Sequence, residues 1–342
     1  MTLALRRDAL VQAGRQAWLD HFPGAAVAVL VAMAAAFLGA HYKGSMLLFA
    51  LLLGMALNFL IEDARLRTGI QFVAGTVLRL GVALLGLRLT LDNVASLGLT
   101  MVLALAVGVA ATLLVSLLVA RLLGLERDLG LLVGGATAIC GASAALAIAS
   151  VLPQREGHDK RTTLAVIGVT TLSTVAMVVY PALTVWLGLD DTRAGIFIGA
   201  TIHDVAQVVG AGYSLSPAAG DAETITKLMR VALLMPVLLC ISLGVRAGAA
   251  GATGGRGTPL LPWFMVAFAV LMLVNSSGLV PSLVQAVATQ GSQVCLVVAI
   301  AAVGLKTSLR DVASLGWRPV LLLVLATLFL AALAAVYLHT LH

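Results

Sequence analysis

Long apolar runs recur along almost the whole chain, and this feature limits the fold more than any other. Many of the runs approach the roughly 20 residues that an α-helix needs to cross about 30 Å of hydrocarbon. The sequence therefore predicts an all-α polytopic membrane protein with about 9–11 transmembrane helices, forming one integral membrane domain over residues 1–342. The runs span residues 24–41, 45–60, 70–90, 98–122, 129–151, 163–187, 195–214, 228–246, 260–278, 284–305 and 317–339.

The composition supports a membrane protein. Of the 342 residues, 61% are hydrophobic and 11% are charged, whereas about a quarter of the residues in a soluble domain are charged. The basic residues behind the formal net charge of +6 lie in short loops, where they set topology, so no nucleic-acid partner is expected. Cys140, Cys240 and Cys295 all lie in apolar runs without metal-ligand spacing. We expect neither a metal nor a cofactor.

The distribution of basic residues predicts the topology. Arg6, Arg7 and Arg15 favour a cytoplasmic N-terminus, and the later loops favour a periplasmic C-terminus. If segment 129–151 crosses fully, the basic loop after it falls outside, against the positive-inside rule. If instead 129–151 and 195–214 each enter and leave on one side, all basic loops fall inside. The first alternative gives about 11 crossings and the second about 9, with broken or re-entrant segments in the second.

Segment 195–214 carries three polar side chains that are costly in hydrocarbon: His203, Asp204 and Gln207. We expect Asp204 to be the only acidic residue deep within an apolar run, and such residues usually face a bundle interior, a wet cavity or a counter-charge. On a helix, His203 and Gln207 can share one face. A carboxylate beside an imidazole can exchange protons near neutral pH. This pattern predicts a substrate or proton site, with a helix-packing hydrogen-bond network as the alternative.

The run Gly134–Ala145 is rich in small residues. It can unwind within the membrane and present backbone N–H groups, because the N-terminus of a half-helix suits an anion. The alternative is close helix packing through small residues, and Cys140 fits a buried filler better than a nucleophile. The candidate substrate-binding residues are Thr137, Cys140, Gly141, Ala142, Ser143, Thr201, His203 and Gln207.

Basic side chains near these segments are candidate partners. Lys227 and Arg230 lie about one helical turn apart at the start of the next apolar run, where they can pair with Asp204, receive an anion or extend to the membrane interface. Arg79 lies within the third run, and three alternatives are open for it. It is a buried anion ligand, a partner of Asp204, or a sign that the run begins after it. The candidate coupling residues are His203, Asp204, Lys227, Arg230 and Arg79.

Two internal similarities indicate duplication. Gly86–Gly98 resembles Gly304–Gly316, and the shorter Gly135–Ile139 resembles Gly199–Ile202. Such repeats are common in secondary transporters, so we expect inverted repeats. The chain shows no nucleophile elbow, phosphate loop or other catalytic motif in a suitable context, so we do not expect an enzyme.

These motifs together resemble the YeiH-like family of bacterial inner-membrane proteins, which is often named for sulfate export. At the level of the fold, that family is similar to the sodium/proton antiporter and bile-acid symporter group. The resemblance implies inverted repeats, broken helices that cross near the middle of the membrane, and a core that moves against a panel domain. It rests on residues 78–90, 137–144, 199–207 and 227–230.

The leading hypothesis is a secondary transporter, an exporter of a small anion such as sulfate, sulfite or a sulfonate. The stretch from Thr137 to Ser143 would offer donors to the anion, and His203, Asp204 and Gln207 would complete the site or couple transport to H⁺ or Na⁺. A cation/proton antiporter of the same fold is the second hypothesis and an anion channel the third. The partners expected are the anion and the lipid bilayer, and a homodimer is one option for assembly.

Overall fold

The computed structural model describes residues 2–42, 45–153, 155–248, 263–307 and 316–340, and the described elements are all helices. Seven helical stretches are long and apolar enough to cross a membrane, which confirms an all-α polytopic membrane protein. The other four predicted runs differ. Two are short helices, α2 (Met46–Ala56) and α13 (Trp263–Ser276), and two are broken in the middle. The seven stretches are Leu19–Tyr42, Ala64–Leu87, Thr100–Leu122, His158–Trp186, Pro217–Gly244, Ser282–Lys306 and Trp317–Thr340.

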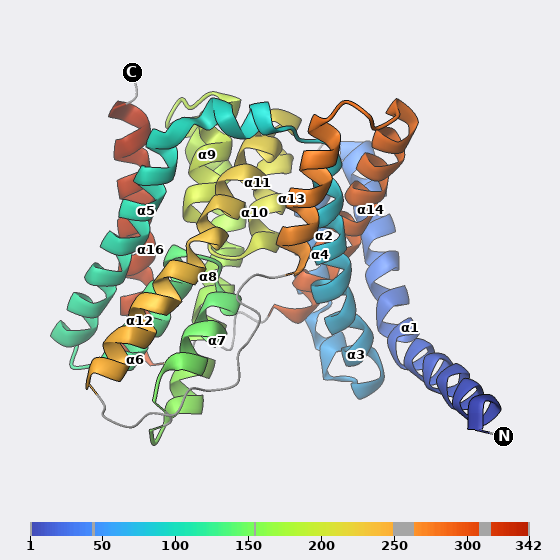
Figure 1. The fold of residues 1–342 in the computed structure, drawn as a ribbon, viewed down its shortest axis with the longest axis horizontal. Coiled ribbons are helices and arrows are strands. Elements are labelled where there is room, and N and C mark those ends of the chain that lie inside the picture. The colour runs from blue at the N-terminus through green and yellow to red at the C-terminus, as the bar shows by residue number, and fades with distance from the viewer. Residues whose placement is uncertain (1, 43–44, 154, 249–262, 308–315, 341–342) are drawn as a thin grey trace. The chain divides into compact units, whose positions relative to one another are not determined.

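The chain divides into two compact units (Figure 1). Unit 1 comprises Met1–Leu85 and Pro281–Thr307, and unit 2 comprises Gly86–Val280 and Ser308–His342. The elements of unit 1 are α1 (Thr2–Tyr42), α2 (Met46–Ala56), η1 (Asn58–Glu62), α3 (Ala64–Phe72), η2 (Val73–Val77), α4 (Leu78–Leu84) and α14 (Ser282–Lys306).

Glycines allow the helices of unit 1 to approach closely. A methyl group added at Gly54 on α2 would lie 2.4 Å from the Ala301 carbonyl oxygen on α14, and one at Gly304 would lie 2.4 Å from the Leu51 carbonyl oxygen. Helices in membranes associate through such small-residue contacts, because lipid tails remove the hydrophobic gain that drives packing in water.

We expect Gly304→Val to separate α2 from α14, because the new side chain would meet backbone rather than a movable side chain. The predicted loss is about 1–3 kcal/mol, the usual cost of overpacking. Thermal unfolding of the purified protein in detergent measures it. Gly244→Val is the control, because a methyl group there would meet nothing within 4 Å. Equal melting temperatures for the two variants would contradict close α2–α14 packing.

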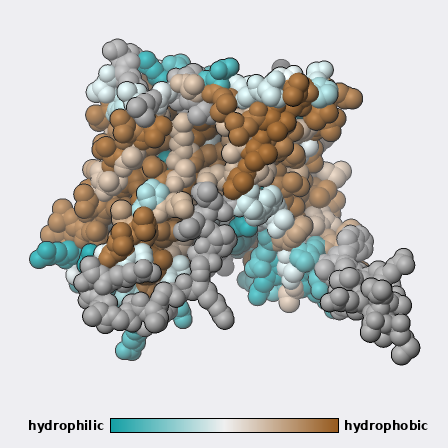
Figure 2. Space-filling view, in the orientation of Figure 1, coloured by the Kyte–Doolittle hydropathy of each residue, from teal (hydrophilic) through white to brown (hydrophobic). Residues whose placement is uncertain are grey.

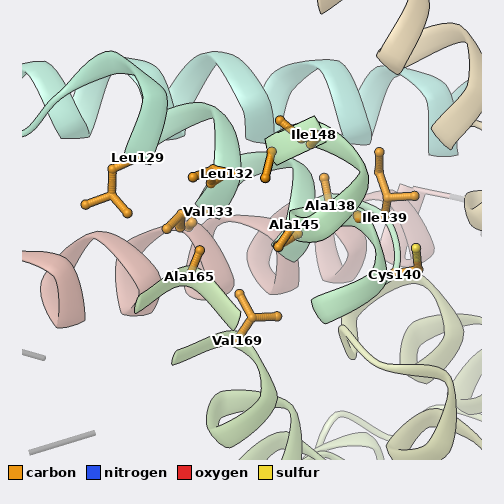
Figure 3. Close-up of a cluster of buried hydrophobic side chains, with 14 of the residues drawn as sticks. Leu129, Leu132, Val133, Ala138, Ile139, Cys140, Ala145, Ile148, Ala165 and Val169 are labelled. Carbon is orange, nitrogen blue, oxygen red and sulfur yellow. The ribbon is translucent and has the colours of Figure 1, made fainter. Parts of the chain in front are cut away.

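Unit 2 contains the remaining helices around a buried apolar core. In Figure 3, side chains from α6, α7 and α8 interdigitate there, among them Leu132, Ile148 and Val169. The elements are α5 (Leu91–Leu122), α6 (Arg127–Ala138), α7 (Ala142–Val151), α8 (His158–Trp186), α9 (Asp191–Thr201), α10 (Val205–Leu215), α11 (Pro217–Ala232), α12 (Leu234–Gly248), α13 (Trp263–Ser276) and α16 (Trp317–Thr340).

The exposed face of α5 is apolar. Figure 2 shows that hydrophobic residues also cover much of the visible surface of the other helices of unit 2. Exposed apolar faces of this length are avoided by soluble monomers and suit contact with lipid. The exposed residues of α5 recur at helical spacing: Leu103, Val107, Leu114, Leu118 and Leu122.

The first broken segment is a helical hairpin. α6 ends at Ala138, and α7 begins at Ala142. A methyl group added at Gly135 on α6 would lie 2.0 Å from Ile148 Cδ1 on α7. In a continuous helix, residues 13 positions apart would be separated by about 20 Å, at 1.5 Å per residue. The chain therefore turns back on itself, and the start of α6 and the end of α7 lie at the same end of unit 2.

The second broken segment folds in the same way. α9 ends at Thr201 and α10 begins at Val205. Methyl groups added at Gly199 on α9 and Gly212 on α10 would both contact Glu223 on α11, at 2.5 Å from its carbonyl oxygen and 2.2 Å from its Cγ. Both glycines therefore lie beside the same residue of α11, so α9 and α10 also form a hairpin.

The long helix α8 connects the two hairpins, which therefore come from opposite ends of unit 2. In Figure 1, α6 and α7 lie low in this unit and α9 lies high. Ser173 and Thr174, near the middle of α8, contact the tip of the second hairpin. Of the two alternatives for these segments, this arrangement supports the one in which both enter and leave on one side.

The longer internal similarity has partial structural support. Gly98 and Gly316, which end the two similar stretches, both have positive φ, 75° and 80°; Gly98 forms a kink within α5 and Gly316 directly precedes α16. Only glycine adopts such a φ without strain. Much of the second stretch, residues 308–315, lies outside the described residues.

Candidate functional site

The buried ammonium group of Lys227 on α11 joins the tips of the two hairpins. Its Nζ donates to the Ile139 carbonyl of the first tip at 2.8 Å. It also donates to two carbonyls of the second tip, that of Ile202 at 2.9 Å and that of His203. Lys227 is 1% exposed, so these carbonyl oxygens take the place of water around the charge.

Arg230, one turn further along α11, makes the same connection. It donates to the first tip through Nε to the Ala138 carbonyl and Nη2 to the Thr137 carbonyl, both at 2.9 Å. Its Nη1 donates to the second tip, at 2.8 Å to Gly199 and 3.1 Å to Ile202. We call Lys227 and Arg230 the cation pair.

The position of the cation pair has a simple electrostatic reason. The last turns of α6 and α9 leave carbonyl oxygens without helical partners, and these ends carry partial negative charge. All of these carbonyls except that of His203 come from the two similar stretches Gly135–Ile139 and Gly199–Ile202, which occupy equivalent places in the two hairpins. The shorter similarity therefore has a structural counterpart. The cation pair is buried, which argues against the alternative in which the two side chains extend to the membrane interface.

Asp204 lies where the two tips meet. It precedes α10, and its backbone N–H donates to Ser173 Oγ at 2.9 Å. A methyl group added at Gly141, the residue before α7, would lie 2.8 Å from both Cγ and Oδ1 of Asp204. The carboxylate is therefore beside the N-terminus of α7, where unpaired N–H groups and the helix dipole favour negative charge.

His203 is completely buried and faces away from Gln207. Its Nδ1 lies 3.1 Å from the Thr201 carbonyl, and its Nε2 lies 2.9 Å from Thr327 Oγ1 on α16. Gln207 instead donates to Thr174 Oγ1 on α8 at 3.3 Å. The expectation that His203 and Gln207 share one helical face is wrong, because His203 lies in the break between α9 and α10.

Two of the predicted binding residues carry buried polar atoms without a hydrogen-bond partner among the described residues, Thr137 Oγ1 and Gln207 Oε1. Buried atoms of this kind call for an explanation, such as a bound water or ligand. Ser143, in the first turn of α7, has an exposed side chain, whereas the Thr201 hydroxyl donates to the Phe197 carbonyl at 2.6 Å. Ser143 is therefore better placed than Thr201 to meet a solute.

Three other predicted residues have clear positions. Cys140 is a buried free thiol at the tip of the first hairpin, and Ala142 begins α7. Arg79 lies on α4 in unit 1 and is exposed, so its prediction as a buried ligand is wrong. It lies well inside the stretch Ala64–Leu87, which also excludes a run that begins after it.

Sequence reasoning missed a buried carboxylate, Glu223 on α11. It is 0% exposed and lies within a stretch long enough to cross a membrane. The prediction that Asp204 is the only acidic residue inside an apolar segment is therefore wrong. The predicted apolar run 228–246 begins after this residue. Glu223, Lys227 and Arg230 nevertheless follow the i, i+4, i+7 spacing of one helical face, which is a signal for a longer helix.

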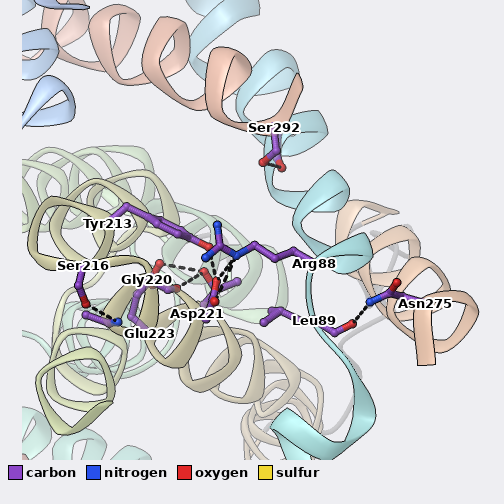
Figure 4. A network of polar contacts seen from close by, with 12 residues as sticks. Arg88, Leu89, Tyr213, Ser216, Gly220, Asp221, Glu223, Asn275 and Ser292 are labelled. Atoms are coloured by element: carbon purple, nitrogen blue, oxygen red, sulfur yellow. Dashed lines mark hydrogen bonds and ion pairs between the residues drawn. The ribbon is translucent and has the colours of Figure 1, made fainter. Parts of the chain in front are cut away.

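Glu223 lies close to a polar network that Figure 4 shows at one end of α11. Arg88 Nε lies 2.9 Å from Asp221 Oδ1, and the Tyr213 hydroxyl donates to the same oxygen at 2.8 Å. The Arg88 guanidinium also lies over the Tyr213 ring, 5.5 Å from its centre. The side chains of Arg88 and Asp221 are 22% and 27% exposed, so this network reaches the solvent-accessible surface.

A cavity of about 130 Å³ lies on another side of the cation pair. It is enclosed mainly by apolar side chains of α5, α9 and α16, such as Leu105 and Leu333, with Arg230 at its wall. Such a lining does not suit a strongly hydrated anion, because few polar groups could replace the water that the anion would lose. We therefore place the candidate anion site at the hairpin tips.

Comparison with known proteins identifies the family. A family model described as conserved hypothetical protein 698 matches residues 23–323, and the chain belongs to this family. The UPF0324 membrane protein TauZ of Paracoccus denitrificans is 50% identical, with 94% of this chain and 95% of the relative covered. For UPF0324 membrane protein CT0845 of Chlorobaculum tepidum, the values are 47%, 94% and 90%. These matches confirm the predicted family resemblance. No solved structure matches the chain.

Proposed function

We propose that this member of the conserved hypothetical protein 698 family is a secondary transporter of a small anion, such as sulfate, sulfite or a sulfonate. The observation that carries the proposal is the meeting of two opposed hairpins beside the cation pair, near the middle of α8. Secondary transporters place substrates at such breaks, where half-helix ends supply charge and donors. The bacterial inner membrane, with the N-terminus cytoplasmic and the C-terminus periplasmic, is the proposed location.

The N-terminus of α7 is the proposed anion-binding element. The backbone N–H groups near Ala142 and Ser143 have no helical acceptors at this end, and the exposed Ser143 hydroxyl adds a donor. Asp204 already lies beside Gly141 there. An anion that approaches must meet its carboxylate, so anion binding and the charge of Asp204 are linked. Negative charge near the site opposes anion binding, and this is our reason to propose coupling to H⁺, with Na⁺ as the alternative.

A cation/proton antiporter is the second candidate, favoured by one observation. Glu223 is a buried carboxylate one helical turn before Lys227, in addition to the half-buried Asp204, and antiporters exchange cations at carboxylates. The cation pair favours the anion transporter instead, because two buried positive charges repel a cation. An anion channel would show flux without coupling. We propose no enzymatic activity, and a homodimer stays a prediction.

Flux in proteoliposomes tests the proposal. We expect Asp204→Asn to lower the flux of labelled sulfate, sulfite or ethanesulfonate by about tenfold or more, a change of about 1.4 kcal/mol. His203→Ala should lower flux as well, because it removes the contact to Thr327 that holds the second tip. Asp159→Asn, on an exposed residue, is the control. Wild-type flux from both tip variants would exclude the coupling role of this segment.

A further inference from the structure

We propose that Glu223 is the residue that carries the transported proton, and that its charge controls how strongly the cation pair attracts the anion. The proposal rests on the transport function proposed above. It assigns a role to a group that lies outside the anion site, one helical turn before Lys227 on α11. Four observations support it: burial, an unpaired oxygen, the neighbouring charges and a connection to the surface.

The surroundings of Glu223 satisfy only part of its carboxyl group. Its Oε1 accepts from the Thr224 hydroxyl at 2.8 Å, while Oε2 is buried without a hydrogen-bond partner among the described residues. A permanently ionised carboxylate in this place would be costly, because burial removes the water that stabilises its charge. A carboxyl group that binds and releases a proton meets this cost in only part of a transport cycle.

Glycines make the space that Glu223 occupies. Methyl groups added at Gly199 and Gly212 would both collide with this residue. Its backbone lies against Gly199 of α9 and its side chain against Gly212 of α10, so Glu223 contacts both helices of the second hairpin. A change in its charge acts directly on the hairpin whose tip carries Asp204.

The charged and titratable groups around Glu223 come from α11, α10 and the segment before α5. On α11 itself, Lys227 follows one turn later and Asp221 lies two residues before. Tyr213 of α10 hydrogen-bonds Asp221, and Arg88 pairs with Asp221 from the segment before α5. α9 presents Gly195 and Gly199 to α11 at this level. Glu223 thus lies between the cation pair and the partly exposed network of Figure 4.

This position links proton binding to anion binding. A proton from water forms an O–H bond at the Glu223 carboxyl group, and the same bond breaks on release, with no other bond changed. When Glu223 is neutral, the two charges of the cation pair exceed the single charge of Asp204 by one, and a monovalent anion such as a sulfonate completes the balance. When Glu223 is ionised, the charges already balance and the anion is released. Proton and anion therefore travel together.

Two transport assays on proteoliposomes separate coupling from binding. With acid outside, we expect wild-type protein to accumulate sulfate or ethanesulfonate. Glu223→Gln resembles the neutral acid permanently, so accumulation driven by the pH gradient should fall at least about fivefold, the lower end of usual coupling strengths. Exchange of internal for external anion, which needs no proton movement, should persist. Glu223→Asp should recover part of the accumulation, and Glu62→Gln, on an exposed residue, should behave as wild type.

The outcomes distinguish this proposal from the transport function. Wild-type accumulation by Glu223→Gln would overturn the role of Glu223 and leave the transporter intact. An absence of anion flux in wild type would overturn the transport function. Infrared spectroscopy of the purified protein then still tests Glu223. A carboxylic acid C=O band that is present in wild type, shifts in Glu223→Asp and is lost in Glu223→Gln supports proton binding there. A spectrum without that band overturns it.

Discussion

Replacement of Gly141 by alanine is expected to reduce anion flux by more than about 100-fold, because two costs add to about 3 kcal/mol. The first is conformational: Gly141 has φ 62° and ψ −131°, a region that residues with a Cβ rarely adopt. The second is steric and electrostatic, since the new methyl group would lie 2.8 Å from the Asp204 carboxylate carbon and push that side chain from the α7 N-terminus. Proteoliposome flux measures the effect.

Gly188→Ala is the matched control for this prediction. Gly188 also has positive φ, 67°, but a methyl group there would meet nothing within 4 Å. This variant carries a backbone cost without the contact to Asp204. We expect it to lose some thermal stability and to keep its flux. If Gly141→Ala transports as well as Gly188→Ala, the contact between the two tips is not needed for transport.

Arg230→Met is expected to produce the largest loss of stability. It removes donors from four buried carbonyls, those of Thr137, Ala138, Gly199 and Ile202. Loss of one partner from a buried charged contact typically costs about 3–5 kcal/mol. That cost corresponds to a fall of about 10 °C in the apparent melting temperature. Thermal unfolding in detergent, followed by tryptophan fluorescence, measures it.

Two variants sharpen the Arg230 experiment. Arg121→Met removes an exposed arginine, so its melting temperature should stay near that of wild type. Arg230→Lys keeps the charge but loses the planar fork that reaches both tips at once, so we expect an intermediate value. Equal melting temperatures for Arg230→Met and Arg121→Met would show that the two hairpins hold together without this contact.

The sequence predicted the helices well because hydropathy is a local property. Seven of its eleven apolar runs correspond to long helices, and the loop charges singled out the two segments that prove to be hairpins. The small residues around Gly141 and the polar residues around Asp204 correctly marked where those hairpins turn. In each case a short stretch of sequence was sufficient for the prediction. Its residues set either the free energy of transfer into lipid or the ability of the backbone to adopt an unusual conformation.

The side-chain partners depended on the fold. His203 and Gln207 were expected on one helical face, but the helix breaks between them and sends one toward Thr327 and the other toward Thr174. Glu223 was missed because hydropathy alone set the start of the predicted membrane span. By that criterion, the charged first half of an amphipathic helix looks the same as a polar loop. Its spacing from Lys227 already placed them on one face of a helix.

By itself, the sequence determined that this chain is a helical membrane protein with two interrupted segments, because each of those properties follows from neighbouring residues. Only the tertiary structure decided that the interruptions meet and that Lys227 and Arg230 bind the carbonyls of both. The physical reason is that the buried charges on α11 find their partners at the ends of α6 and α9. The residues that make these contacts are as many as 93 positions apart in the chain. No local pattern specifies which helix ends will share a cation.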